Sequence, residues 1–311
     1  MINNIIPIAI VINNDYAMQA SVVIASLISS KNTDTFYHVN IVADSIDENN
    51  SKKLLSMQTN NVKIDIIQLG TKYKDITNNT RWPNIIFYKF DVPFILNNYE
   101  KVILLDADTI VLKDLSELYN NKLQDNYAAV VPDITQVLKL DLIEELPNYF
   151  NIGMVLFNVK KIKEDFTLND FINCYKANAF RFLSPEQDTL NYLFDKKIYH
   201  ISPKFQYITL YENYLKHNFY NFYKQYKTRK ISNDDIVILH FQQMRPWVYG
   251  NIPFGNLWRF YYRMSPYNEK LENKIYNPIF NLYRKIRYNY RYLIFRKKLF
   301  FNYKSRSEIL Q

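Results

Sequence analysis

Glycine and cysteine are scarce in this sequence. Only four glycines occur in 311 residues. Neither of the glycine-rich patterns that cradle phosphates, Gly-x-x-x-x-Gly-Lys-Ser/Thr and Gly-x-Gly-x-x-Gly, is present. The single cysteine, Cys174, excludes an intramolecular disulfide framework and a zinc site built from cysteines. A nucleotide that binds this chain must therefore be held by other groups.

Long apolar runs are also missing. No stretch of about 18 apolar residues occurs, so the sequence predicts no membrane-spanning helix. Residues Met1–Pro7 lack a basic start followed by an apolar core, and we therefore expect no signal peptide and a cytoplasmic location. Hydrophobic residues make up 48% of the chain, which is enough for a sizeable folded core.

Acidic residues are absent from most of the C-terminal part of the chain. Between Lys274 and Ser307 there are ten basic residues and no Asp or Glu. Subtracting these ten from the net charge of +9 leaves −1 for the rest, so the body of the protein is nearly neutral. We predict a main domain at residues 1–265 and a basic, aromatic helical tail at residues 266–311. Such a tail would attach the protein peripherally to the anionic inner face of the cell membrane.

The tail leaves two alternatives open. One is a solvated tail without a binding role. The other is a protein without enzymatic activity that binds membranes or nucleic acid through the tail, because basic residues mixed with Tyr and Phe are typical of such segments. The nearly neutral body argues against nucleic acid as the main ligand.

Strands and helices alternate from the start of the sequence. This alternation predicts an α/β fold with a mixed, mostly parallel sheet covered by helices. Ser184, followed by Pro185 and Gln187, is a typical helix start. Strands are expected at residues 7–14, 37–43, 62–69, 102–105, 127–131, 151–158 and 236–240, and helices at residues 15–30, 48–59, 84–96, 161–178 and 185–194.

Two carboxylates, Asp106 and Asp108, directly follow the apolar strand Val102–Leu105. Carboxylates this close repel each other unless a cation or hydrogen-bond donors compensate. His240 ends the last predicted strand, and ligands of parallel sheets bind outside the carboxyl ends of strands. Two carboxylates and one imidazole suit Mn2+ or Mg2+ better than zinc. The alternative is that the two acids cap residues 112–119 as ordinary turn acids and that the histidine belongs to the core.

Four motifs follow one another along the chain. They are Leu-Leu-Asp106-Ala-Asp108, then Phe-Asn151-Ile-Gly-Met-Val-Leu-Phe-Asn, then Glu186-Gln187-Asp188-x-Leu-Asn, and His240 followed by Arg245-Pro246-Trp247. In this order, over most of the chain, the sequence resembles glycosyltransferase family 8, retaining enzymes that include bacterial lipopolysaccharide galactosyl- and glucosyltransferases. The resemblance implies a GT-A (Rossmann-like) fold and Mn2+-dependent transfer of galactose or glucose. The implied donor is a UDP-sugar, and the acceptor is an oligosaccharide or a lipid-linked glycan.

The resemblance also implies roles for single residues. Asp106 and Asp108 match the pair that holds the metal, with Asp106 also contacting the ribose, and His240 matches the third metal ligand. Gln187 matches the residue beside the anomeric carbon, and Asp188 matches the neighbouring acid that is an alternative nucleophile. An amide is a poor nucleophile, which favours front-face transfer over a covalent intermediate but leaves both open. The residues that match nucleotide- or sugar-binding positions are Val11, Asn13, Tyr16 (stacked on uracil), Lys89, Asp133, Asn151, Glu186 and Arg245.

The sequence departs from the family pattern in three places. The family's glycine between the histidine and the basic residue is missing from Phe241–Met244, which is also one residue shorter. Lys89 stands where the family has an arginine, which keeps the charge but loses the two-pronged hydrogen-bonding group. Asn13 and Asn14 precede Asp15 where the family has an acidic residue first. We interpret these differences as tuning of donor choice or affinity.

A phosphatase is the remaining enzymatic alternative. Asp106-Ala-Asp108-Thr109 also fits the start of haloacid-dehalogenase-like phosphatases, in which Asp106 would be the nucleophile and Asp108 the acid/base. That motif normally opens the first strand, whereas three strand–helix units are predicted to precede it here. The later paired acids of such enzymes follow a strand, but Asp234 and Asp235 precede one.

Overall fold

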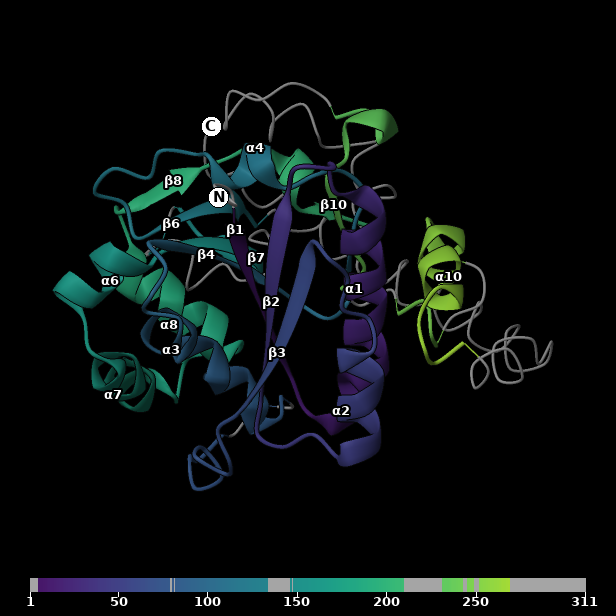
Figure 1. Cartoon of the computed structure of the whole chain (residues 1–311). Coiled ribbons are helices and arrows are strands. Elements are labelled where there is room, and N and C mark those ends of the chain that lie inside the picture. The colour runs from purple at the N-terminus through teal and green to yellow at the C-terminus, as the bar shows by residue number, and fades with distance from the viewer. Residues whose placement is uncertain are drawn as a thin grey trace.

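A computed structural model describes residues 5–78, 80, 82–133, 146, 148–209, 231–242, 245–248 and 252–268. Almost all of the tail predicted at residues 266–311 lies outside this part of the chain. The described residues form a seven-stranded mixed sheet in the order β3-β2-β1-β4-β7-β6-β8, with helices on both faces (Figure 1). The predicted α/β fold is confirmed.

One half of the sheet is parallel and is built from the first third of the chain. Most of its residues are apolar and buried, as expected for strands that are covered on both faces, except in the edge strand at residues 62–68, which has exposed polar residues. Because the strands are parallel, their carboxyl ends meet at one edge of the sheet. The strands are β1 (Ile5–Ile12), β2 (Phe36–Ala43), β3 (Val62–Gln68) and β4 (Lys101–Leu105).

Strand β7 (Phe150–Asn158) runs in the opposite direction, between β4 and β6 (Ala128–Pro132). The edge strand β8 (Ile198–His200) lies parallel to β6. Because β7 is reversed, its first residues lie at the same edge as the last residues of β4 and β6. Asn151, the second residue of β7, therefore lies at the carboxyl edge, where α/β sheets bind ligands.

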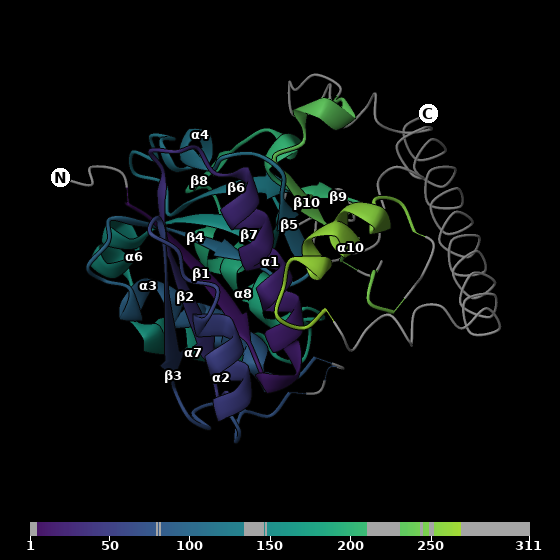
Figure 2. The same cartoon turned by 45° about the vertical axis from the view of Figure 1, so that its right-hand side comes forward.

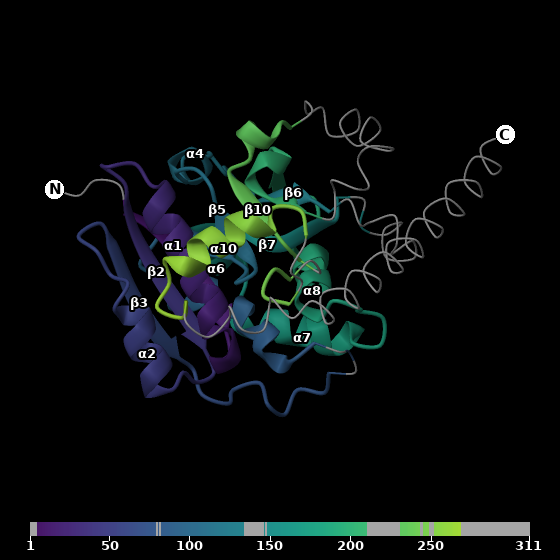
Figure 3. The same cartoon turned by 90° about the vertical axis from the view of Figure 1, so that its right-hand side faces the viewer.

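Each strand divides its side chains between two cores, because successive residues point to opposite faces. In β4, Ile103 and Leu105 pack on one face, and Val102 and Leu104 pack on the other. The first core includes α1 (Ala17–Ser30), α2 (Glu48–Leu55) and α10 (Gly255–Arg263), and α10 lies beside α1 in Figures 2 and 3. The second includes the 3-10 helix η2 (Asn84–Phe90), α6 (Val159–Asp165), α7 (Leu168–Asn178) and α8 (Pro185–Phe194).

A second, three-stranded sheet joins distant parts of the chain. Its order is β5-β10-β9, with β10 (Ile238–His240) antiparallel to β5 (Thr109–Val111) and parallel to β9 (Tyr207–Ile208). The sequence did not predict β5, β8 or β9. The remaining short elements are α4 (Ser116–Tyr119) and the 3-10 helices η1 (Asn14–Tyr16), η4 (Pro203–Phe205) and η5 (Asn233–Asp235).

Two predicted helices are wrong in detail. The helix expected at residues 84–96 is η2, followed after Asp91 by the short helix α3 (Val92–Ile95), which has a proline at its start. The helix expected at residues 161–178 is two helices, α6 and α7. The backbone is extended at Phe166 and Thr167, and Thr167 forms a capping box with Asp170 that begins α7. Within the described residues, none of the helices is both long and apolar enough to cross a membrane.

Candidate active site

Asp106 and Asp108 lie in a tight turn between β4 and β5. Thr109 closes the turn, because its backbone N–H and its hydroxyl both donate to the carbonyl oxygen of Asp106, at 3.2 and 2.8 Å. The N–H of Asp106 donates to the carbonyl oxygen of Gly153 at 2.9 Å, which ties the turn to β7. Both carboxylates are partly exposed although the strand before them is buried. The turn thus presents two carboxylates at the carboxyl edge of the sheet.

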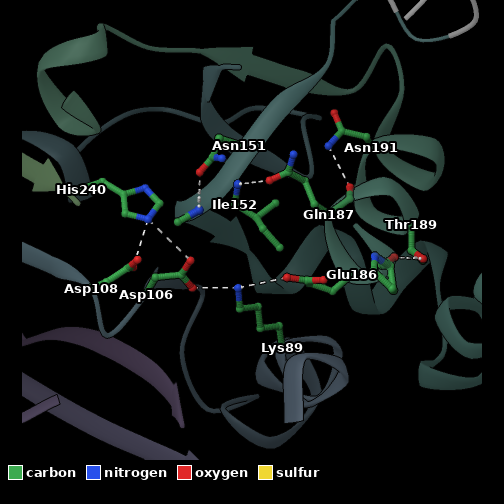
Figure 4. Close-up of polar contacts among 12 residues, drawn as sticks. Lys89, Asp106, Asp108, Asn151, Ile152, Glu186, Gln187, Thr189, Asn191 and His240 are labelled. Atoms are coloured by element: carbon green, nitrogen blue, oxygen red, sulfur yellow. Dashed lines mark hydrogen bonds and ion pairs between the residues drawn. The ribbon is translucent and has the colours of Figure 1, made fainter. Parts of the chain in front are cut away.

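His240 reaches these carboxylates through the small sheet. Pairing of β10 with β5 places His240 opposite Thr109, and the N–H of Phe241 donates to the carbonyl oxygen of Asp108 at 2.9 Å. His240 Nε2 lies 3.0 Å from Asp108 Oδ1 and 3.9 Å from Asp106 Oδ2 (Figure 4). One ligand atom from each of the three residues lies within 4.8 Å of the others. Two carboxylates and one imidazole at this spacing could hold a divalent cation such as Mn2+ or Mg2+.

Lys89 bridges the carboxylates of two different elements. Its Nζ lies 2.7 Å from Asp106 Oδ1 and 3.6 Å from Glu186 Oε1 (Figure 4). Burial disfavours the charged form of Lys89, but Asp106 and Glu186 outweigh it and raise the pKa of the ammonium group. Burial raises the pKa of Glu186, and Lys89 only partly opposes this change. The lysine therefore keeps its charge between two acids at the site.

The pKa of His240 is also set by burial and by neighbouring carboxylates, which act in opposite directions. Burial disfavours its charged form, but the carboxylates of Asp108 and Asp106 outweigh burial and raise the pKa of His240 above its ordinary value of 6.5. The histidine is 2% exposed, so the carboxylates act across surroundings with little water to screen them.

Gly153 and Gln206, to which no role in the site was assigned from the sequence, determine the position of His240. A Cβ atom on Gly153 would overlap Cε1 and Nδ1 of the His240 ring and would lie 2.9 Å from Gln206 Nε2. Gln206 Nε2 lies 3.2 Å from His240 Nδ1 and donates to Asn151 Oδ1. The glycine in an otherwise apolar strand was a usable signal of close packing. Gln206 follows a 3-10 turn and carries no such signal.

Amide and carboxylate groups continue the site beyond the candidate metal-binding group. Asp133 follows β6, Asn151 is the second residue of β7, and Gln187 lies in the first turn of α8. Asp133 Oδ2 accepts hydrogen bonds from Gln187 Nε2 at 3.2 Å and from Asn151 Nδ2 at 3.5 Å. Asn151 Oδ1 accepts from the N–H of Gly153 at 2.9 Å. These contacts join three predicted sugar-binding or catalytic residues in one network.

Asp188 is buried and caps the start of α8. Its Oδ2 accepts from the N–H groups of Leu183 and Ser184 at 2.7 and 2.8 Å, and its Oδ1 accepts from the hydroxyl of Tyr149. Ser184 occupies the predicted N-cap position, but its side chain makes no capping hydrogen bond. Tyr149 was not identified from the sequence. Whether Asp188 acts as a nucleophile stays a prediction.

The predicted nucleotide-binding residues lie at the end of β1, the strand beside β4. The Tyr16 ring packs edge to face on Trp247, with ring centroids 6.3 Å apart. Asn13 Oδ1 is buried without a hydrogen-bond partner among the described residues, and Val11 is partly buried. Pairing of Ile10 with Leu105 places the end of β1 next to the end of β4, which Asp106 follows, and the contacts of these side chains with a nucleotide stay predictions.

The segment after His240, which lacks the family's glycine, contains a residue in a backbone conformation that favours glycine. Gln242 has a φ of 47°, in the left-handed region that non-glycine residues seldom adopt. Arg245, beyond this turn, is exposed, and its expected contact with a diphosphate stays a prediction.

Comparisons with known proteins show the family of the chain and relatives of its fold. The sequence model of glycosyl transferase family 8 matches residues 7–250. A lipopolysaccharide 1,2-glucosyltransferase from Escherichia coli is 28% identical over 273 residues, which is 82% of this chain and 77% of the relative. Galactosyltransferase LgtC, solved with donor and acceptor sugar analogues, has a TM-score of 0.71 at 17% identity, covering 84% of this chain and 96% of that one. The bifunctional glycosyltransferase WbbM has a TM-score of 0.73 at 17% identity, and the match covers 88% of this chain but only 52% of that one.

Proposed function

The chain belongs to glycosyltransferase family 8, and we propose that it transfers galactose or glucose from a UDP-sugar to a glycan acceptor with retention of the anomeric configuration. The observation that carries the proposal is the group of Asp106, Asp108 and His240, which lies next to Lys89 and Glu186 at one edge of the sheet. The matched family and the fold also favour this reaction over the phosphatase alternative.

Asp106, Asp108 and His240 would hold the metal ion, which we propose to be Mn2+, with Mg2+ as the alternative. When bound, a divalent cation neutralises the charge that develops on the diphosphate as the glycosyl–phosphate bond breaks. Lys89 would hold the Asp106 carboxylate in position for the metal, because its ammonium group forms an ion pair with that carboxylate and compensates part of its charge. Arg245 is the second cation that we propose for the diphosphate.

Asp133, Asn151 and Glu186 are the proposed partners of the donor-sugar hydroxyls. Glu186 is 8% exposed, and its Oε2 is buried without a hydrogen-bond partner among the described residues. Buried polar atoms are normally satisfied, and a sugar hydroxyl is a suitable donor for a carboxylate oxygen. We propose that Tyr16 stacks on uracil and that Val11 and Asn13 contact the base and ribose.

The acceptor is proposed from the printed name of the E. coli relative, a lipopolysaccharide 1,2-glucosyltransferase. A lipopolysaccharide or lipooligosaccharide acceptor is anchored in a membrane. The basic, aromatic composition of residues 266–311 supports peripheral attachment to the inner face of the cell membrane, where such an acceptor would be reached. The full chain should float with vesicles that contain anionic phospholipid, and binding that is equal on neutral vesicles would contradict this part of the proposal.

A UDP-release assay tests the proposed reaction. Several UDP-hexoses are incubated with the protein, with and without Mn2+, and slow hydrolysis of at least one donor is expected only with the metal. The matched variant is Asp108→Asn, which removes one ligand charge and keeps the shape of the side chain. It should abolish Mn2+-dependent turnover and leave the circular dichroism spectrum unchanged. Full activity of this variant would show that the two acids serve only the turn.

A further inference from the structure

The Tyr149 hydroxyl links the two predicted catalytic residues. Gln187 Nε2 donates to this hydroxyl at 2.9 Å, and the hydroxyl donates to Asp188 Oδ1. Tyr149 is 1% exposed. Burial, with Asp188 and Asp133, raises the pKa of Tyr149 well above its ordinary value of 10, so the hydroxyl keeps its proton. The direction of the hydrogen bonds is thereby fixed from Gln187 through Tyr149 to Asp188.

Asp188 is engaged on both carboxylate oxygens. Oδ1 accepts from Tyr149, and Oδ2 accepts from the backbone of Leu183 and Ser184 at the start of α8. The residue has no exposed surface. A nucleophilic carboxylate needs an accessible oxygen directed at the reacting carbon. The contacts of Asp188 instead suit a group that anchors its neighbours.

The amide of Gln187 has one favourable orientation in this network. Its nitrogen donates to Tyr149 and to Asp133 Oδ2, and its Oε1 faces the N–H of Ile152 at 3.4 Å (Figure 4). Exchanging the amide oxygen and nitrogen would place Oε1 against a carboxylate oxygen, so that two acceptors would face each other. The carbonyl oxygen of Gln187 can still accept a further hydrogen bond from a ligand.

We propose that Tyr149 and Asp188 are positioning residues that fix the Gln187 amide for sugar transfer, and that Asp188 is not the nucleophile of this chain. The inference rests on the proposed function. In this proposal Gln187 contacts the donor sugar beside the anomeric carbon, as the family resemblance implies, and Tyr149 acts through it. A small displacement of such a group lowers the rate of the chemical step more than it changes the binding of the substrate.

Tyr149→Phe tests the link because it keeps the ring and removes only the hydroxyl. We expect kcat to fall at least about tenfold, with the KM for the UDP-sugar unchanged within about twofold. Tyr175→Phe is the matched control, since Tyr175 is also 1% exposed and its hydroxyl donates to the carbonyl oxygen of Thr77 at 3.1 Å. The control should keep full kcat. An unchanged kcat in Tyr149→Phe would overturn the proposal.

A double-mutant cycle separates positioning from a general loss of stability. In a Gln187→Ala background, Tyr149→Phe should change kcat by less than about twofold, because the group that it positions is gone. An equal loss in both backgrounds would contradict the inference. Asp188→Asn should lose about as much activity as Tyr149→Phe. Complete loss of transfer by a folded Asp188→Asn protein, with Tyr149→Phe fully active, would instead support a nucleophilic aspartate.

A readout that does not need turnover separates this inference from the proposed function. If the unmodified protein releases no UDP from any UDP-hexose with Mn2+, the proposed function fails. Hydrogen exchange of the Gln187 side-chain amide, assigned by its absence in Gln187→Ala, still tests the network in that case. The amide should be protected in the unmodified protein and exchange at least about tenfold faster in Tyr149→Phe. Equal exchange in the two proteins would refute the positioning role.

Discussion

At the scale of single residues, the position of His240 depends on a glycine, Gly153, which has no side chain to occupy the space of the imidazole ring. Gly153 leaves room for the His240 ring, which a Cβ atom would overlap. His240 is 2% exposed and has little space to move away. Gly153→Ala should therefore displace the imidazole and weaken Mn2+ binding at least about tenfold, because the proposed metal ligand is moved from its position. Titration with Mn2+ followed by electron paramagnetic resonance measures this affinity directly.

The control for Gly153→Ala is the same substitution in a protein that also carries His240→Ala. In a His240→Ala background the ring is absent, so Gly153→Ala should have little further effect on Mn2+ affinity. An additional tenfold loss in that background would show that the alanine acts through something other than the histidine.

Cys174 provides a test of burial away from the site. Burial raises the pKa of its thiol to about 11, above the ordinary value of 9.0. A higher pKa means less thiolate at a given pH, and the thiolate is the reactive form. At pH 8 alkylation by iodoacetamide should be about a hundredfold slower in the folded protein than in urea. The native rate should rise with pH up to about 11, and a plateau near pH 9 would contradict the assignment.

At the scale of elements, the break between α6 and α7 shows how a local polar contact overrides helical periodicity. Apolar spacing continues through residues 161–178, but Asp170 Oδ2 accepts from both the N–H and the hydroxyl of Thr167 at 2.7 Å. This capping box starts a new helix and ends the old one. The signal is present in the sequence as Thr-x-x-Asp, but it competes with a periodic pattern that suggests one long helix.

Removing the cap should destabilise the protein without changing its chemistry. Thr167 is exposed, so Thr167→Ala removes little packing and should lower the free energy of unfolding by about 1 kcal/mol. Asn169→Ala, an exposed substitution in the same turn, should change it by less than about 0.5 kcal/mol. Urea unfolding compares the two variants. Equal stabilities would mean that the box contributes nothing.

Strands that contain a run of aliphatic residues could be predicted from the sequence, as β1 and β4 were. The two- and three-residue strands β5, β8 and β9 are too short to show a period, and they form because a neighbouring strand offers hydrogen-bond partners.

At the scale of the whole molecule, the candidate metal-binding group of Asp106, Asp108 and His240 joins two sheets. Asp106 and Asp108 follow the large sheet, and His240 arrives on the small one. Because the unfolded chain does not hold these three groups together, a metal that binds them stabilises the folded protein. At a hundredfold excess over its dissociation constant, Mn2+ should raise the free energy of unfolding by about 2.7 kcal/mol.

Thermal unfolding with and without Mn2+ measures this effect. The Asp108→Asn protein is the control, and its melting temperature should be nearly independent of Mn2+. If Mn2+ raised the melting temperature of the unmodified and the Asp108→Asn proteins equally, the stabilising metal would bind elsewhere in the molecule.

The arrangement of strands in the whole molecule explains which site residues the sequence could indicate. Asp106 and Asp108 directly follow β4, and the rule that parallel strands bind ligands at their carboxyl ends indicates them. His240 also ends a predicted strand, but that strand, β10, belongs to the separate small sheet, and its pairing with β5 brings the histidine to the aspartates. Asn151 lies at the same edge although it is near the start of its strand, because β7 runs in the opposite direction. Gln206 and Tyr149 have no distinctive position in the chain, and their importance follows from side-chain contacts that form only in the folded protein.

The pairing of β10 with β5 also sets an order of events during synthesis. Strands β1 to β4 lie within the first 105 residues, and β5 follows at once, but its partner begins only at Ile238. Closing so long a loop is slow compared with forming local pairs. A nascent chain can therefore assemble the parallel half of the large sheet on the ribosome while its two aspartates still lack their histidine. We expect such a ribosome-bound intermediate to remain unable to bind Mn2+ tightly until the last strand emerges from the exit tunnel.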